Sequence, residues 1–524
     1  MIDRKFPLDI PSVLDSGIED WFNDLDWPYP WLDFLNVEQD IMNVFNNLIY
    51  QNRNSYLGDL LLVNYYTYLD LITLIHTLKI IYEAKKNGYN LKYADDSKYF
   101  KSLVNNEIPD NLIISIPNLQ PKSWKDIIRK MKFILKNNNI STLFFSRKKC
   151  YVLHQSYNVF ALSYLQRAKK CKIFPLDIRS FYKESIIENR ECTISERKEI
   201  RNLAITLIDE ISEIVEHKYF IVIPKNILDY TKERLISNFS KTNLIYKILL
   251  DKLKPHAPIN LFLGANKNVY TRMFTLAIRK NGGTVNSFMH GNPLIHELDW
   301  ISWLELPFAD YFYAFNENAA KAFYDTSLRF SAPNGNRCEF KSANVNHFQK
   351  YINNSTSPNI KNIMLVPSPY TQENHALPQY FPNLIRLHFE YMIIDKLVKH
   401  GYKVLYQKHP GDYFKNKKMD FFSKAEVLYS TFEESMHRAD AFIFYHTRTS
   451  TFGPALCTTK PVIWLDGGWE PINPKVRKLL EKRCCIIKLA LNDKHLYDID
   501  ISLINDALTS DKKYNKEFVE TYLM

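Results

Sequence analysis

The strongest constraint on the fold is a series of short apolar segments separated by helical intervals between Tyr402 and Asp466. The segments are 403–406, 441–445 and 461–465. Runs of this length are typical of strands that are buried on both faces of a parallel sheet. The intervals between them have helical patterns, so this part of the chain predicts an α/β domain with helices covering its sheet.

Polar residues follow each of these predicted strands. In such sheets, ligands bind at the carboxyl ends of the strands. Hydroxyl and backbone N–H groups at the start of a helix, with basic side chains nearby, form a suitable site for phosphate. We therefore expect an anion site formed by Lys408, His409, Pro410, Arg448, Thr449, Ser450 and Thr451.

A second α/β unit precedes this one. Predicted strands at 259–263 and 284–289 are connected by a helix over 270–280, and a third predicted strand at 309–315 is followed by a helix that begins at Asn316. Their carboxyl ends place Asn266, Lys267 and His290 at one edge of a sheet. We expect Asn266 and Lys267 to line the acceptor side of a cleft.

The length of the chain, 524 residues, exceeds what one hydrophobic core supports. Residues 331–359 have the composition of a linker, and a further strand is predicted at 363–366. The sequence thus predicts two Rossmann-like lobes facing a cleft, with extra N-terminal helices. We expect an N-terminal acceptor-side lobe over 1–345 and a C-terminal nucleotide-donor lobe over 346–524.

The first 250 residues carry no recognisable motif. Residues 1–36 are predicted to be irregular, and 37–86 to be helical up to a stop at Asn87-Gly88. Thr193 and Glu196 have the spacing of a capping box. We also expect helices over 124–136, 157–170, 197–215 and 227–254, and strands over 142–145 and 219–224.

Charge and cysteine usage restrict the partners and the compartment. A net charge of +11 suits an anionic partner, but no nucleic-acid-binding motif accompanies it, so no nucleic acid is expected. The seven cysteines form no C-x-x-C pair, and no signal peptide or apolar run of roughly 18 residues is present. We expect a cytoplasmic protein with peripheral contact at the inner face of the cell membrane. Acidic pairs such as Asp498 and Asp500 do not follow a suitable strand, so no metal or cofactor is expected.

Four short motifs, taken in order, resemble those of GT-B type glycosyltransferases of bacterial surface polysaccharide synthesis. They are His290-Gly-Asn-Pro293, Lys408-His-Pro410, Ser450-Thr451 and Lys460-Pro-Val462. The last three are similar to elements of capsule and lipopolysaccharide enzymes that transfer Kdo or sialic acid from CMP donors. The first is similar to an element of the CDP-glycerol glycerophosphotransferases. The resemblance covers about residues 259–485.

The resemblance implies a role for each matching residue. His409, Ser450 and Thr451 would contact the donor nucleotide and its phosphates, and His290 would face the cleft as the catalytic base or as a group that orients the acceptor. Glu297 and Asp299, on the same predicted loop, are alternative catalytic carboxylates. Many relatives have an acidic residue that holds the ribose before the Lys-Pro-Val strand, whereas this chain has Pro454.

We therefore expect a glycosyltransferase that uses a nucleotide-activated sugar, with a CMP-linked acidic sugar such as Kdo favoured. Its acceptor would be a lipid-linked or growing surface glycan. Three alternatives stay open at this point. They are a CDP-glycerol or polyol phosphotransferase, a hydrolysing sugar-nucleotide epimerase, and a catalytically silent subunit that binds carbohydrate or nucleotide.

Overall fold

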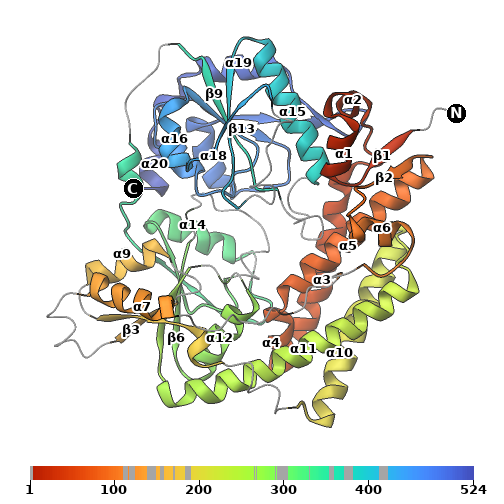
Figure 1. The fold of residues 1–524 in the computed structure, drawn as a ribbon. Helices are drawn as coiled ribbons and strands as arrows, with labels where there is room; N and C mark the ends of the chain where they lie inside the picture. Colours follow the sequence, from red (N-terminus) through yellow and green to blue (C-terminus); the bar gives the residue numbers. More distant parts are fainter. Residues whose placement is uncertain are drawn as a thin grey trace.

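Two six-stranded parallel sheets form the frame of the protein (Figure 1). The computed structural model describes residues 4–109, 112, 116, 124–138, 149–153, 158–168, 171–182, 191–264, 266, 268–289, 291, 305–329, 331–352, 359–370, 382–411 and 423–524. Helices cover the faces of each sheet, so the predicted plan of two Rossmann-like lobes with additional N-terminal helices is confirmed.

The C-terminal sheet has the order β11-β10-β9-β12-β13-β14. Numbered along the chain from β9, this is 3-2-1-4-5-6, the doubly wound order in which ligands bind where the connections diverge, here between β9 and β12. All pairings are parallel. The strands are β9 (Asn362–Val366), β10 (Lys403–Gln407), β11 (Glu426–Leu428), β12 (Ala441–Phe444), β13 (Val462–Asp466) and β14 (Cys485–Lys488).

The helices of this lobe connect successive strands or follow the last one. The longest is α15 (Asn383–Lys399), which begins after β9 and is buried along most of its length. The others are α16 (Phe432–Ser435), α17 (Phe452–Leu456), α18 (Pro474–Arg483), α19 (Ile501–Thr509) and α20 (Glu517–Tyr522). A small antiparallel pair, β15 (Ala490–Leu491) and β16 (Tyr497–Asp498), follows β14.

The N-terminal sheet has the order β4-β3-β5-β6-β7-β8. Its predicted strands are confirmed as β5 (Asn260–Leu263), β6 (Thr284–Phe288) and β7 (Tyr311–Ala314). Two strands were not predicted, β3 (Lys149–Leu153) and β4 (Lys172–Leu176). The linker prediction over 331–359 is wrong in part, because β8 (Glu339–Ser342) pairs along β7 as the edge strand. The helices of this lobe are α7 (Trp124–Asn137), α9 (Val159–Ala168), α12 (Val269–Lys280) and α14 (Glu317–Ser327).

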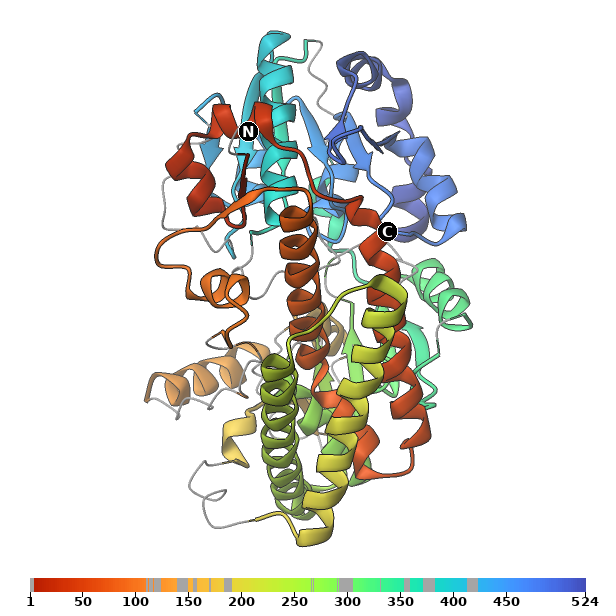
Figure 2. The ribbon, with the colours of Figure 1, turned by 90° about the vertical axis from the view of Figure 1, so that its right-hand side faces the viewer.

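Long helices form a layer along one side of both lobes (Figures 1 and 2). The predicted capping box at Thr193 is present and begins α10, while Asn87 ends α5. The predicted strand at 219–224 is wrong. The α10 helix continues to Tyr219, and Phe220 takes a left-handed conformation with φ 55°. The long helices of the layer are α3 (Phe34–Gln51), α5 (Tyr65–Lys86), α10 (Ile194–Tyr219) and α11 (Lys225–Leu253), and the shorter ones beside them are α4 (Tyr56–Val63) and α6 (Lys98–Val104). The strand predicted at 142–145 lies outside the described residues.

The start of the chain is more regular than predicted and packs on the C-terminal lobe. It forms β1 (Lys5–Pro7), α1 (Ile10–Ser16) and α2 (Ile18–Asp24), and β1 pairs with β2 (Asn90–Lys92). The ring of Phe22 stacks on His388 of α15 at a centroid distance of 4.5 Å. At the other end of the chain, the Asn316 side chain donates a hydrogen bond to the Thr521 carbonyl at 3.0 Å. Each lobe is therefore covered partly by chain from the opposite terminus, and the domain boundary at 345 stays a prediction.

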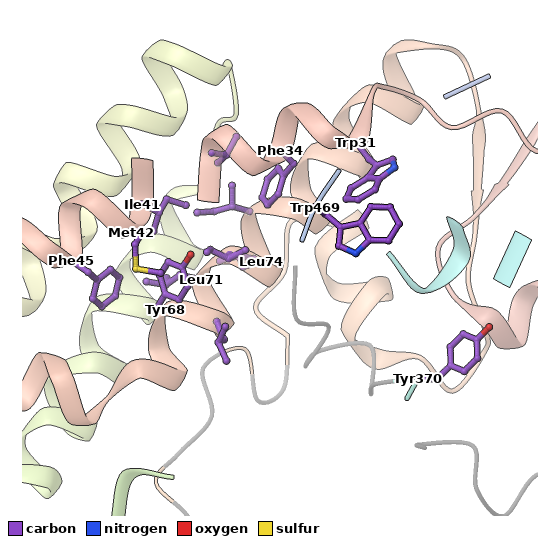
Figure 3. Close-up of a cluster of buried hydrophobic side chains, with 14 of the residues drawn as sticks. Trp31, Phe34, Ile41, Met42, Phe45, Tyr68, Leu71, Leu74, Tyr370 and Trp469 are labelled. Atoms are coloured by element: carbon purple, nitrogen blue, oxygen red, sulfur yellow. The ribbon is translucent and has the colours of Figure 1, made fainter. Parts of the chain in front are cut away.

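One hydrophobic core continues from the N-terminal helices into both lobes. It includes Phe45 on α3, Leu263 on β5 and Ile443 on β12. Figure 3 shows the part of this core where Trp31, just before α3, lies beside Trp469 of the C-terminal lobe, with ring centroids 5.9 Å apart. The N-terminal helices therefore hold the two lobes together. Within the described residues, no helix combines the length and the apolar character needed to cross a bilayer.

We expect the Trp31→Ala variant to lose about 3–5 kcal/mol of unfolding free energy, because a buried indole at the junction of α3 and the C-terminal lobe leaves a cavity. Urea denaturation measures this loss. As a control, Tyr82→Ala on α5 removes an aromatic side chain that is 50% exposed and should change stability by less than about 0.5 kcal/mol. A loss below about 1 kcal/mol in Trp31→Ala would contradict the proposed contact between α3 and this lobe.

Candidate active site in the cleft between the lobes

A buried carboxylate fixes the turn that follows β12. Glu470 accepts hydrogen bonds from the backbone N–H and the hydroxyl of Thr447, at 2.8 and 2.7 Å. Its other oxygen contacts His446 Nδ1 and lies 3.7 Å from Arg448 Nε. Because Glu470 is only 2% exposed, these charge-assisted contacts are not weakened by water. The turn that carries Arg448 and Thr449 is thus held in one conformation.

The chain after β13 is shaped to deliver Glu470 to this turn. Gly467 has no room for a side chain, since a Cβ there would lie 1.3 Å from the Trp469 ring. Gly468 has φ +87°, which favours glycine, and its N–H donates to Asp466 at 3.0 Å. The sequence predicted the strand before these glycines but not this role of Glu470.

The predicted donor residues after β10 are partly buried beside this turn. His409 Nδ1 accepts a hydrogen bond from the Gly411 N–H at 3.0 Å. Burial lowers the pKa of His409, and the positive fields of His446 and Arg386 lower it further. The His409 imidazole is therefore neutral at pH 7. The Lys408 side chain is also buried, with Nζ 5.4 Å from the centroid of the Tyr429 ring.

Arg386 is a residue of this region that sequence analysis missed. It lies in the first turn of α15, is 1% exposed, and donates hydrogen bonds to Ser368 Oγ and the Pro369 carbonyl, both at 2.8 Å. Its guanidinium also lies 3.8 Å from the centroid of the Tyr370 ring. The signal for it in the sequence was an arginine that stands between the apolar residues Ile385 and Leu387. Arg386 orders the segment that follows β9 and adds positive charge near His409.

A polar cluster beneath the strand ends connects the central strands. Glu390 on α15 accepts hydrogen bonds from Tyr370 and Tyr406, both at 2.8 Å, and from Tyr445. Burial raises the pKa of Glu390 to about 7, against the opposing effect of Arg386. These bonds join α15 to the ends of β9, β10 and β12, so the floor of the candidate site is rigid.

The N-terminal lobe brings one predicted acceptor-side residue into the described structure. Asn266, after β5, is 1% exposed, and its carbonyl accepts a hydrogen bond from Arg272 Nε at 3.0 Å. Its side-chain amide has no hydrogen-bond partner within the described part of the chain. The other predicted residues on this side, His290, Glu297, Asp299 and Lys267, lie outside the described residues.

The two lobes meet where Gly291 faces Ser450. Gly291 has φ +84°, and a Cβ there would lie 3.0 Å from Ser450 Cβ. Beside this contact is a cavity of about 320 Å³ that residues of both lobes and of the connecting segment line, among them Asn158, Phe160, Gly291, Tyr351, Ser450 and Pro454. Gly291 and Ser450, one residue from each of two motifs that the sequence singled out, therefore lie side by side at a cavity. Asn266 is not among the residues that line it.

Pro454 stands where many of the resembling enzymes have the acidic residue that holds the ribose. Pro454 lines the cavity, whereas the nearby acidic residue Glu470 is buried against the turn after β12. The carboxylate that does line the cavity belongs to Glu433, an exposed residue of α16. Among the described residues, no group of three or more His, Cys, Asp or Glu side chains has an arrangement suited to a metal ion.

Neither protein-family models nor curated protein sequences give a match to this chain. Solved structures are similar in part, each with 9% identity. UGT2 of Phytolacca americana, complexed with UDP-2fluoro-glucose and pterostilbene, is matched over 72% of this chain and 93% of that chain with a TM-score of 0.36. A GtfA/B complex is matched over 54% of this chain and 57% of that chain with a TM-score of 0.32. A structure of accessory secretory protein 1, 2 and 3 of Streptococcus pneumoniae is matched over 55% of this chain and 56% of that chain with a TM-score of 0.26. These TM-scores are too low to decide an activity.

Alanine at Gly291 tests the close approach of the lobes. Gly291→Ala and Gly335→Ala both place a side chain at positive φ, which costs roughly 1–2 kcal/mol, but only Gly291 has a neighbour, Ser450, within 4 Å. We expect Gly291→Ala to lose about 1 kcal/mol more than Gly335→Ala in urea denaturation, because Ser450 must move. Equal losses would show that Gly291 does not touch Ser450 in solution.

Removal of the Glu470 carboxylate tests its role in holding the turn. We expect Glu470→Ala to lose roughly 3–5 kcal/mol of unfolding free energy, since it removes the acceptor of the buried Thr447 N–H and hydroxyl and the carboxylate beside the buried Arg448. Urea denaturation measures the loss, and Glu433→Ala, at an exposed carboxylate, serves as the control. A loss of the same size in both variants would contradict the role assigned to Glu470.

Proposed function

We propose that this protein is a glycosyltransferase that moves a sugar from a nucleotide-activated donor to a glycan acceptor. The observation that carries the proposal is the contact of Gly291 with Ser450 at the cavity between the lobes. It brings together Gly291, from the His-Gly-Asn-Pro motif, and Ser450, from the Ser-Thr motif, at the carboxyl ends of two parallel sheets. This is the position at which ligands of doubly wound domains bind.

The chemistry of the turn suits a departing nucleotide phosphate. Transfer of a glycosyl group leaves negative charge on the donor phosphate, and hydrogen-bond donors held in advance stabilise that charge. Arg448 and the Thr449–Thr451 hydroxyls provide such donors on a turn fixed by Glu470. His409 and Arg386 add polar and positive groups next to it. In this proposal, Lys408 and Pro410 complete the donor side.

The finer parts of the proposal concern donor, acceptor and base. We propose a CMP-linked acidic sugar such as Kdo as donor, and a lipid-linked or growing surface polysaccharide at the inner face of the membrane as acceptor. His290 immediately precedes Gly291 in the chain and is proposed as the base that accepts the proton of the acceptor hydroxyl. Glu297 and Asp299 are the alternatives for this role, and Asn266 and Lys267 are proposed for the acceptor side.

A thermal-shift screen with CMP, CDP, UDP, GDP and ADP tests the proposal, because a ligand that binds the native state raises its stability by about 2.7 kcal/mol at 100 times Kd. We expect CMP to raise the melting temperature most. His409→Ala and Arg448→Ala should each weaken binding about tenfold, the cost of a lost charge-assisted contact, while His437→Ala, at an exposed histidine, should bind as the wild type does.

The other outcomes separate the alternatives. A preference for CDP would favour a CDP-polyol phosphotransferase, and a preference for UDP or GDP would favour a hexose donor. Selective binding of a nucleotide without turnover of its sugar conjugates would favour a silent binding subunit. A wild-type protein that none of the five nucleotides stabilises would contradict the proposed function.

A further inference from the structure

Helix α7 of the N-terminal lobe presents a row of apolar side chains to solvent. Ile128, Met131 and Leu135 are 41%, 60% and 70% exposed. Their spacing of three and four residues places them on one face of the helix. Within the described part of the chain, no other helix carries three large apolar side chains that are exposed. Single exposed apolar residues are common on protein surfaces, but a row of three on one helix indicates a contact with an apolar partner.

A row of basic side chains runs along the same exposed side of α7. Each of the three apolar residues is followed directly by a basic residue, so the basic row lies about 100° farther round the helix. The acidic residue of α7, Asp126, lies 3.6 Å from Arg129. The basic row extends over the whole helix and consists of exposed residues, which are Lys125, Arg129, Lys132 and Lys136.

The opposite side of α7 fixes the helix to the N-terminal sheet. Asp126 is mostly buried and pairs with Arg179 Nη1 at 3.1 Å. Phe133 packs against the core of this lobe. Just after the helix, the Asn138 side chain accepts a hydrogen bond from the Ile173 N–H of β4 at 2.7 Å and donates one to the Ile173 carbonyl at 2.9 Å. The helix therefore lies firmly beside α9 on the outside of the lobe, with its basic and apolar rows facing away from the sheet (Figure 1).

We propose that the exposed side of α7 is a membrane-binding surface that lies in the interface of a bilayer with anionic lipid headgroups. An apolar row enters the boundary between headgroups and acyl chains, while a neighbouring row of lysine and arginine is attracted to the anionic headgroups. The long basic side chains can keep their charges at headgroup level while the apolar side chains are buried. A nucleic acid would match the basic row alone and leave the apolar row in water.

This surface lies on the lobe that is proposed to hold the acceptor. Binding through α7 would bring the cleft close to lipid-linked glycans, which a protein free in solution would meet less often. The link to a lipid-linked acceptor rests on the proposed function. The binding of lipid itself depends only on the side chains of α7, so the two can be tested separately.

Sedimentation of the full-length protein with vesicles tests the proposal. One set of vesicles consists of phosphatidylcholine, and the other is an equal mixture of phosphatidylcholine and phosphatidylglycerol. We expect at least roughly tenfold tighter binding to the mixed vesicles at about 0.1 M salt. This preference should be largely lost at about 1 M salt, where the Debye length falls from about 10 to about 3 Å.

Two double variants separate the contributions of the rows. Lys132→Gln with Lys136→Gln should weaken binding to the mixed vesicles roughly 25-fold, because each basic residue near an anionic surface contributes roughly fivefold. Met131→Ser with Leu135→Ser should weaken it roughly tenfold or more, because these side chains no longer bury apolar surface in the bilayer. All four side chains are exposed, so the urea midpoint and any thermal shift by nucleotide should stay as in the wild type.

Matched controls change exposed residues of the same kinds on the C-terminal lobe. Lys512→Gln with Lys516→Gln removes two exposed lysines, and Leu503→Ser removes a leucine of α19 that is 46% exposed. Both should bind vesicles as the wild type does. α7 variants that bind as tightly as these controls would overturn the inference, as would a wild type that does not bind the mixed vesicles.

The remaining outcomes are also decisive. A loss in the lysine variant with no change in the Met131 and Leu135 variant would show a purely electrostatic contact and would overturn insertion into the interface. A protein that binds a nucleotide but no vesicles would lose the membrane surface and keep the proposed function. Binding to vesicles through α7 in a protein that no nucleotide stabilises would keep the membrane surface and contradict the proposed function.

Discussion

The buried carboxylate of Glu470 is the interaction on which the arrangement of the site depends. It holds Thr447 and contacts His446 and Arg448, so the turn after β12 cannot move independently of the segment after β13. The residue before it, Trp469, packs against Trp31 at the start of the N-terminal helices. One short segment thus joins the donor turn, the central sheet and α3. A site held this firmly has its hydrogen-bond donors in place before a ligand arrives.

The same connection explains what the first 100 residues do for the rest of the molecule. Their helices carry one hydrophobic core from the N-terminal sheet to the C-terminal sheet, and α2 covers α15 through Phe22 and His388. In a protein whose cleft lies between two lobes, such a layer limits how far the lobes can separate. The helical layer is therefore part of the architecture of the site and not an appendage to it.

The sequence was most informative where periodicity and short motifs coincide. Strands β5, β6, β7, β9, β10, β12 and β13 were predicted because each is a short apolar run before a polar turn. The run at 219–224 has the same composition but forms no strand, because α10 continues to Tyr219 and Phe220 takes a left-handed conformation. The edge strand β8 was missed, since its residues Glu339–Ser342 include one apolar side chain, Phe340, and none of the four is fully buried. Composition alone does not separate these cases.

The candidate site was predictable in outline, because strand ends of a parallel sheet gather polar residues at one edge. Its supporting contacts were not, since Glu470 and Arg386 act across distances in sequence that no motif spans. A crystal structure of the protein with bound CMP tests the central claim most directly. The account predicts the CMP phosphate beside Arg448 and the Thr449–Thr451 hydroxyls, at the cavity that Gly291 and Ser450 border. A phosphate bound elsewhere, with this turn facing only solvent, would contradict it.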